Sequence, residues 1–121
     1  LNDVKYSFNS YTMDRTTIAA GVASMKDRAY FEECCNKIIA TREWTKTELK
    51  KLGFSFQDSK ANFIFATHES CPAKELFEAL REKHIYVRYF PKDRIDNHLR
   101  ITIGTDEEMK KLVEFLTEYL K

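Results

Sequence analysis

Two arginines in the last third of the chain, Arg88 and Arg100, have the residue type and the spacing to bind an anion. A guanidinium group is planar, stays charged at any physiological pH and can donate two parallel hydrogen bonds to a phosphate or a carboxylate. Each arginine lies in a segment where polar and apolar residues alternate, as in a β-strand. In both segments, 85–90 and 99–103, the arginine falls on the face that the aliphatic residues leave free.

The stretch between these segments, 91–98 (PKDRIDNH), has the composition of a turn, so the two strands are expected to pair as a hairpin. Such a hairpin puts Arg88 and Arg100 on one face, directly opposite each other or nearly so. Like charges in that position destabilise a sheet, so an anion or acidic side chains are expected between them. Lys92 and Arg94 in the turn could add to the positive field. The spacing alone leaves a second interpretation open, in which both arginines point into solvent or pair with local carboxylates such as Asp93, Asp96 and Asp106.

The overall composition indicates one globular domain without a charge bias. The 121 residues include 20 Lys and Arg against 19 Asp and Glu, so no net field draws the chain toward nucleic acid or a membrane. Apolar residues make up 43% and aromatic residues 13%, which argues against disorder. Three glycines are too few for a glycine-rich nucleotide loop. The sequence holds no apolar run long enough for a membrane span, and its first residues do not form a signal-peptide pattern.

The cysteines and histidines predict neither a metal site nor a disulfide framework. Cys34, Cys35 and Cys71 are an odd number without C-x-x-C spacing, so reduced thiols in a cytoplasmic protein are expected. A redox pair of the two adjacent cysteines is the less favoured alternative. The histidines lie too far apart for a metal motif: His68, His84 and His98.

The elements that must position the two arginines can be read from caps and periodicity. Asp14 suits the N-cap of a helix to about Met25, and Asp27 that of a longer helix to about Leu52, ended by Gly53. The predicted order is α-α-β-β-α-β-β-α, an α/β fold of the α+β-sandwich type in which helices cover a small mixed, largely antiparallel sheet. The remaining predicted elements are strands in 54–56 and 62–66, a helix over 72–83, and a last helix opened by a capping box of Thr105 and Glu108.

The long second helix indicates that part of the structure is missing from this sequence. A helix over 27–52 would be about 39 Å long, as long as a domain of this size is wide. A helix of this length must contact something at both ends or overhang. Its apolar stripe is also interrupted midway by Arg42 and Thr45. The chain also begins at Leu1 rather than Met, which suggests a processed or excised piece of a longer protein.

The two arginine segments resemble those of a known enzyme family. The motifs in 87–90 (VRYF) and 99–105 (LRITIGT) are similar to the C-terminal part of histidinol-phosphate aminotransferases, which are fold-type I enzymes that use pyridoxal phosphate (PLP). The second motif is shared across class I and II aminotransferases, whereas the first points to the histidinol-phosphate branch. The resemblance covers nearly the whole chain, since it extends to the segments 5–9, 14–23 and 59–65.

Residues 1–13 are polar and aromatic without sustained periodicity, so an extended segment is expected there. The resemblance implies that this segment crosses from a large domain outside this sequence and that residues 14–121 form an aminotransferase C-terminal small domain. Arg100 would then grip the anionic end of the substrate, which is a phosphate in this branch, and Arg88 would be the second phosphate ligand. Asn9 would border the site. The implied substrates are histidinol phosphate and 2-oxoglutarate or glutamate, and the implied full-length protein is a cytoplasmic homodimer in histidine biosynthesis.

The same resemblance implies PLP as the cofactor, bound mainly by the large domain. The Schiff-base lysine of the family lies in a Ser-x-x-Lys motif, and no such motif leading into a glycine-rich run occurs here. We therefore expect no catalytic residue and no activity of the isolated chain, which would position the substrate instead. Two alternatives remain open: a small domain from an aminotransferase of ordinary amino acids, in which the second arginine holds a carboxylate, and a stand-alone binding module.

Overall fold

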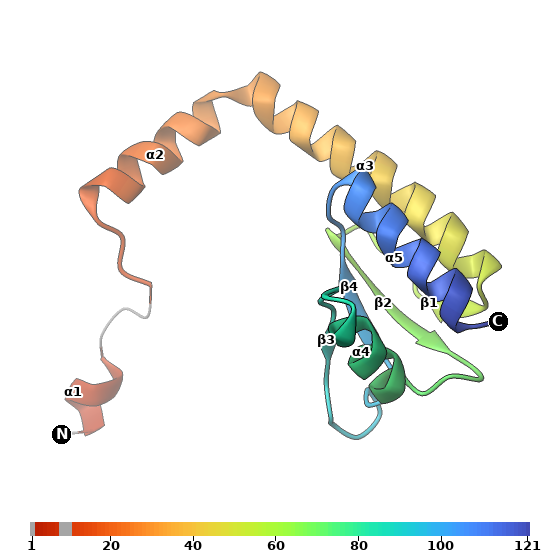
Figure 1. Cartoon of the computed structure of the whole chain (residues 1–121). Helices are drawn as coiled ribbons and strands as arrows, with labels where there is room; N and C mark the ends of the chain where they lie inside the picture. The colour runs from red at the N-terminus through yellow and green to blue at the C-terminus, as the bar shows by residue number, and fades with distance from the viewer. Residues whose placement is uncertain (1, 8–10) are drawn as a thin grey trace. The chain divides into compact units, whose positions relative to one another are not determined.

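A computed structural model of the chain describes residues 2–7 and 11–121. The chain divides into two units, Leu1–Cys34 and Cys35–Lys121. Apart from an additional short first helix, the described elements follow the predicted order α-α-β-β-α-β-β-α (Figure 1). None of the helices in the described residues is long and apolar enough to cross a membrane. The elements are α1 (Asn2–Tyr6), α2 (Arg15–Lys26), α3 (Arg28–Lys51), β1 (Phe54–Phe56), β2 (Phe63–His68), α4 (Ala73–Glu82), β3 (Arg88–Tyr89), β4 (Leu99–Thr102) and α5 (Asp106–Tyr119).

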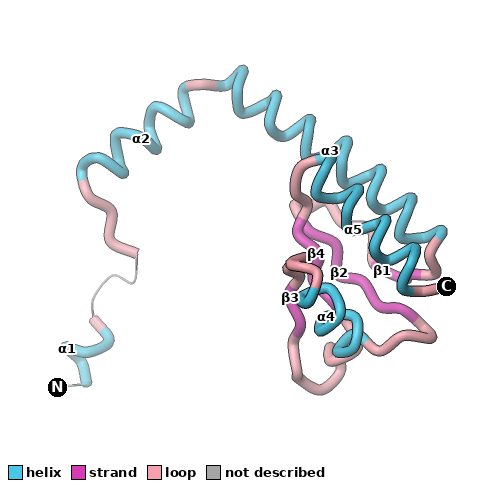
Figure 2. Tube along the Cα trace, in the orientation of Figure 1, coloured by secondary structure: helices cyan, strands magenta, loops and turns pink. Residues whose placement is uncertain are grey.

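The helix ends in the first half of the chain follow local sequence signals. The carboxylate of Asp14 accepts a hydrogen bond from the Thr17 amide at 2.7 Å and thereby caps α2, as predicted. At the end of α3, Gly53 adopts a φ of +86°, which glycine tolerates better than other residues. The extended conformation predicted for the first residues is wrong for α1, whose first turn contains Asp3 (Figure 2). An acidic side chain there interacts favourably with the helix dipole.

The four strands form one sheet in the order β1-β2-β4-β3, and all three pairings are antiparallel. The sheet is therefore not mixed in pairing direction, which refines the predicted largely antiparallel arrangement. Because β4 lies between β2 and β3, the connection through α4 joins two strands that are not neighbours. This topology places the hairpin strand that carries Arg100 in the interior of the sheet and the strand that carries Arg88 at its edge.

Strand β3 is shorter than the predicted strand over 85–90. The amide of Ile85 donates a hydrogen bond to the carbonyl of Leu80, at the end of α4, at 2.9 Å. His84, directly before it, adopts a positive φ of 59°. This helix-end contact holds 85–87 near α4, so the chain pairs with β4 only from Arg88 onward.

The hydrophobic core of the unit Cys35–Lys121 lies on one face of the sheet. The C-terminal half of α3 and the whole of α5 lie side by side over it, with α4 next to β3 (Figure 1). Alternate residues of the central strands point into this layer, because successive side chains of a strand face opposite sides. The buried residues from the strands include Ile64, Ala66, Leu99 and Ile101, and those from the helices include Leu49, Leu76, Leu80, Leu112 and Leu116.

The two polar residues that interrupt the apolar stripe of the long helix, Arg42 and Thr45, are buried in this unit, and so is Lys46. Arg42 is only 5% exposed, and its Nη1 atom donates to the carbonyl of Ala61 at 3.1 Å. Lys46 is 7% exposed and forms ion pairs with Glu43 and Asp58. Because carboxylates and a backbone carbonyl accept hydrogen bonds from these two cationic side chains, Arg42 and Lys46 can be buried with their charges paired. They connect α3 to the loop before β2.

Candidate anion-binding site

The structure brings the two predicted arginines together. Arg88 and Arg100 are directly opposite each other in the register of β3 and β4. Both are exposed, and they lie on the face of the sheet opposite the core, because their strand neighbours Tyr89 and Leu99 form the next pair and Leu99 is buried. The same-face prediction made from the alternation of residues is therefore confirmed.

The row of side chains continues onto the neighbouring strand. Phe65 of β2 is opposite Arg100 of β4, which in turn is opposite Arg88 of β3. Phe63 and Thr102 form the next pair with the same orientation. We call this side of the sheet, with Arg88, Arg100, Phe63 and Phe65, the open face. It combines two cationic groups with half-buried aromatic rings.

Neither arginine has an acidic partner in the part of the chain that the structure describes. The ion pairs found among those residues involve neither guanidinium group. Asp106, one of the carboxylates considered for this role, instead accepts a hydrogen bond from Thr41. Pairing with local carboxylates is therefore wrong for the described residues, and the two positive charges remain available to a ligand.

Aromatic rings take the place of the carboxylates. The guanidinium carbon of Arg100 lies 5.7 Å from the centre of the Phe63 ring, and that of Arg88 lies 5.5 Å from the centre of the Phe90 ring. The sequence did not reveal these contacts. The alternation of 62–66 could have put aromatic rings on one face, but the register between β2 and β4 is not encoded locally.

A region that contains His98 lies next to the arginine pair on the open face. The rings of Phe65 and His98 stack with their centres 4.7 Å apart, and Nδ1 of His98 is buried without a hydrogen-bond partner in the described residues. A shallow hollow of about 380 Å³ lies over this part of the sheet. Aromatic rings and polar groups line it: Ser55, Phe56, Gln57, Phe65, Thr67 and His98.

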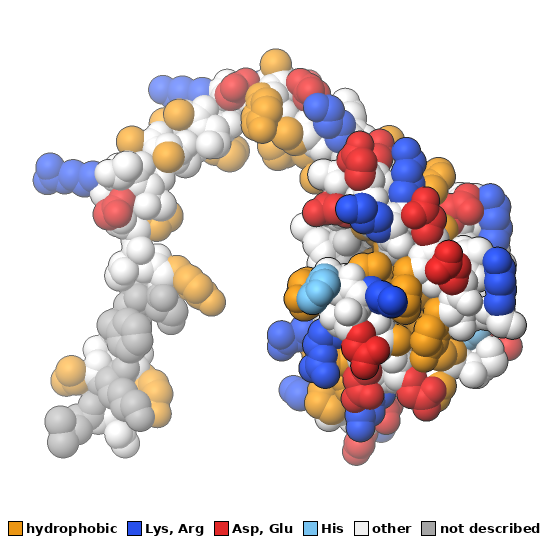
Figure 3. All heavy atoms as spheres, viewed as in Figure 1, with side chains coloured by type: hydrophobic (Ala, Val, Ile, Leu, Met, Phe, Trp, Pro, Cys, Tyr) orange, Lys and Arg blue, Asp and Glu red, His pale blue; other side chains and the backbone are white. Residues whose placement is uncertain are grey.

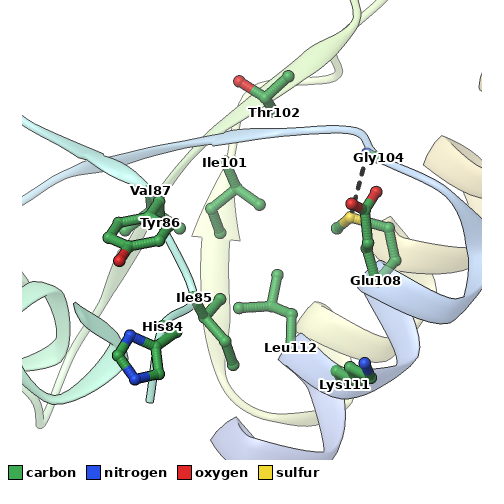
Figure 4. Close-up of a pocket in the computed structure, with 11 residues that line it drawn as sticks. His84, Ile85, Tyr86, Val87, Ile101, Thr102, Gly104, Glu108, Lys111 and Leu112 are labelled. Carbon is green, nitrogen blue, oxygen red and sulfur yellow. Dashed lines mark hydrogen bonds between the residues drawn. The ribbon is translucent and has the colours of Figure 1, made fainter. Parts of the chain in front are cut away.

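Another hollow does not contain the arginine pair. It has a volume of about 450 Å³ and lies between β4, the start of α5 and the segment 84–87 (Figure 4). Ile85, Ile101 and Leu112 point into it, and the amide of Gly104 donates to the sulfur of Met109 at its edge. This hollow lies where the segment leaves β4, and neither Arg88 nor Arg100 lines it.

The other predicted contributors are placed as follows. Lys92 and Arg94 are exposed in the 91–98 turn, and Arg94 adopts a positive φ of 73°. Asn9, the third predicted ligand, lies outside the described residues. The geometry of the site therefore depends on Arg88 and Arg100.

A comparison with protein families identifies the family of this chain. The model for aminotransferase class I and II matches residues 1–116 of the chain. The chain belongs to the class I and II aminotransferases. In this aminotransferase chain, the segment with the exposed arginine pair lies entirely within the matched region.

Curated relatives of this aminotransferase chain extend the comparison. Histidinol-phosphate aminotransferase of Brachyspira hyodysenteriae is 51% identical over 121 residues, which are 100% of this chain and 34% of the relative. The enzyme of the same name from Acinetobacter baumannii is 55% identical over 118 residues, 98% of this chain and 33% of the relative. The chain thus spans about a third of the length of the relatives it matches.

Solved structures share the fold. A histidinol-phosphate aminotransferase of Clostridium acetobutylicum has a TM-score of 0.83 at 23% identity, covering 98% of this chain and 37% of that one. The enzyme of the same name from Sinorhizobium meliloti, solved in complex with pyridoxal-5'-phosphate, has a TM-score of 0.81 at 23% identity, covering 98% of this chain and 33% of that one. The small sheet with helices on one face is therefore an arrangement found within larger enzymes.

Proposed function

We propose that this chain is the substrate-gripping small domain of a histidinol-phosphate aminotransferase that transfers an amino group from histidinol phosphate to 2-oxoglutarate. Residues 14–121 would form that C-terminal domain, and residues 1–13 would cross from the large domain. The observation that carries the proposal is the direct opposition of Arg88 and Arg100 without acidic partners in the described residues. The similarity to histidinol-phosphate aminotransferases supports the choice of substrate.

In this role, Arg100 and Arg88 bind the phosphate of histidinol phosphate. A phosphate dianion offers several oxygens, so it can accept hydrogen bonds from both guanidinium groups and relieve their mutual repulsion. The sheet fixes the two Cα positions, which reduces the freedom that must be lost when the substrate binds. Asn9 would contribute from the crossing segment, at the border of the site.

PLP would be held by the remainder of the full-length protein, because the residues described here do not fit a Schiff-base site. The buried lysine of the described residues is Lys46, and its ammonium donates hydrogen bonds to Asp58 and Glu43, which raises its pKa. A lysine that forms an imine needs a neutral amine and thus the opposite shift. When bound to the full-length protein, PLP supplies the electron sink for transamination. The full-length protein would be a cytoplasmic homodimer.

The proposal can be tested in the full-length, PLP-loaded protein. Arg100→Ala should lower kcat/KM for histidinol phosphate about 10- to 100-fold, since hydrogen bonds between charged groups are among the stronger ones in proteins. Arg81→Ala, which removes an exposed arginine from α4, is the matched control and should leave kcat/KM unchanged. Unchanged activity of Arg100→Ala would mean that this residue does not grip the substrate.

Substrate preference tests the other half of the proposal. We expect kcat/KM for histidinol phosphate to exceed that for phenylalanine and for histidine, because only the first carries a phosphate for the arginine pair. A clear preference for either amino acid would instead assign the protein to the aminotransferases of ordinary amino acids. Arg100 would then hold a carboxylate.

A further inference from the structure

The head groups of the arginine pair lean over different aromatic rings. Arg100 stands over Phe63 and Arg88 over Phe90, at 5.7 Å and 5.5 Å from the ring centres. The face of an aromatic ring is negative, so a cation within about 6 Å of its centre is attracted to it. Each guanidinium group therefore has an uncharged partner.

The register places the two rings toward opposite ends of the hairpin. Phe63 on β2 is opposite Thr102, which follows Arg100 by two residues along β4. Phe90 follows Arg88 by two residues, and because β3 runs antiparallel to β4, it lies toward the start of β4. The two side chains thus diverge from Cα positions that are directly opposite each other.

Aromatic partners relieve the repulsion between the arginines without neutralising them. Two like charges opposite each other destabilise a strand pair, and divergence of the head groups reduces that cost. A carboxylate could also reduce it, but it would compete with an anionic ligand for the same N–H groups. A ring that stacks on the flat side of a guanidinium group leaves the N–H groups at the edge of that group free to donate.

We propose that Phe63 and Phe90 are positioning residues that hold the guanidinium groups of Arg100 and Arg88 apart, with their N–H groups directed to a phosphate between them. This role rests on the proposed function and names the side chains that set the geometry of its phosphate site. A tetrahedral phosphate can accept from two separated donors, whereas a planar carboxylate matches a single guanidinium fork. The two phenylalanines therefore favour phosphate over carboxylate.

Phe65 provides a matched control for Phe63. It lies on the same strand and the same open face, it is also half-buried, and it is directly opposite Arg100. Its ring nevertheless stacks on His98 rather than under a guanidinium group of the described residues. The Phe65 ring also meets the Phe90 ring edge-on, with the ring centres 6.2 Å apart. Replacing either phenylalanine by leucine removes a similar apolar area, but only Phe63→Leu removes a direct contact with a guanidinium group.

The experiment measures the competition of inorganic phosphate with histidinol phosphate in the full-length, PLP-loaded protein, where the cofactor already fills its own phosphate site. Phe63→Leu should raise the inhibition constant of phosphate about two- to fivefold, as expected for a partly exposed cation–π contact. Phe90→Leu should do the same through Arg88. Phe65→Leu, which removes no direct contact with a guanidinium group, should change the constant less than Phe63→Leu does, and Phe63→Tyr, which retains a ring face, should keep the original value.

A second readout separates positioning from general damage to the fold. The kcat/KM for histidinol, which lacks the phosphate, should be the same in Phe63→Leu and in the unmodified protein, whereas kcat/KM for histidinol phosphate falls. Equal losses for both substrates, or equal effects of Phe63→Leu and Phe65→Leu, would overturn the positioning role. If Phe63→Leu does not fold, Phe90→Leu decides between the same outcomes.

Failure of this role is distinguishable from failure of the proposed function. If Arg100→Ala does not change the inhibition constant of phosphate, the arginine pair is not the phosphate site and both ideas are wrong. If Arg100→Ala raises the constant while Phe63→Leu and Phe90→Leu do not, the phosphate site stands and the aromatic rings do not shape it.

Discussion

Arg88 and Arg100 are cross-strand partners on the open face of the sheet, and each stands over a phenylalanine ring instead of beside a carboxylate. An arrangement of two unneutralised cations on neighbouring strands costs folding free energy whenever no anion is bound. Without an anion, the pair itself contributes repulsion to the folded state. Replacing one arginine should therefore increase the free energy of unfolding by a measurable amount.

Arg88→Gln should make the 121-residue chain more stable than the unmodified chain at low ionic strength. Removing one of two opposed charges should increase the free energy of unfolding by about 0.2–1 kcal/mol, measured by urea denaturation. The gain should shrink at high salt, because exposed charges are screened over shorter distances there. Arg81→Gln is the control: Arg81 also stands over a phenylalanine, Phe77, but it lies on a helix rather than in a cross-strand pair. Equal effects of the two substitutions would contradict the prediction.

The ion pair between Lys46 and Asp58 should make stability depend on acid pH. Hydrogen bonds from the ammonium groups of Lys46 and Lys60 lower the pKa of the Asp58 carboxyl to about 2, whereas an unfolded aspartate titrates near pH 3.9, roughly its reference value. Because the folded pKa is the lower one, this stabilisation is fully present above the unfolded pKa and is lost as the pH falls from about 4 to about 2.

Asp58→Asn should therefore lower the urea midpoint of the 121-residue chain at pH 6, and the difference from the unmodified chain should narrow between about pH 4 and pH 2. Asp96→Asn is a suitable control, because Asp96 is an exposed carboxylate without an ion pair among the described residues. A difference that stays constant across this pH range would show that the ion pair is not its source.

Local features of the fold could be predicted from the sequence because neighbouring residues determine them. The cap at Asp14 and the capping box of Thr105 and Glu108 involve side chains and amides three residues apart. The shared face of Arg88 and Arg100 follows from strand alternation together with one hairpin. Each of these predictions needed only a short stretch of chain.

Features that depend on distant segments could not be predicted in the same way. The insertion of β4 between β2 and β3 brings Phe63 beside Arg100, and no local pattern encodes that register. Arg42 interrupts the apolar stripe of α3 and Lys46 lies one turn further on, yet both are buried, because the carbonyl of Ala61 and the carboxylate of Asp58 accept their hydrogen bonds. The aromatic surroundings of the anion site belong to this second group.

The capping box should be important for stability at the start of α5. Thr105 accepts a hydrogen bond from the Glu108 amide, and the Glu108 carboxylate accepts one from the Thr105 amide at 2.8 Å, which lowers the pKa of Glu108. Thr105→Ala should lower the free energy of unfolding by about 1 kcal/mol. Thr117→Ala is the control on the same helix, because its hydroxyl donates only to the carbonyl of Val113. A similar loss for both substitutions would argue against a capping effect.

The apolar stripe of α2 should make the 121-residue chain bind hydrophobic dyes. Ile18, Val22 and Met25 recur at helical spacing and are 50%, 49% and 78% exposed, and Figure 3 shows hydrophobic side chains along this stretch. Exposed apolar surface of this kind usually marks a contact with another protein surface. If the proposed function is right, the remainder of the full-length protein supplies that surface.

Replacing Ile18 and Val22 by lysine should therefore reduce dye fluorescence and any concentration-dependent light scattering of the 121-residue chain. Ala20→Lys is the matched control, because it adds a lysine on the opposite side of the same helix, about 160° away from Ile18 at 100° per residue. In the full-length protein the effect should reverse: the stripe substitutions should lower its stability, because they place charge in a buried contact, whereas Ala20→Lys should not. Equal dye binding by the variant with lysine at positions 18 and 22 and by Ala20→Lys would mean that the apolar stripe of α2 is not the surface that binds the dye.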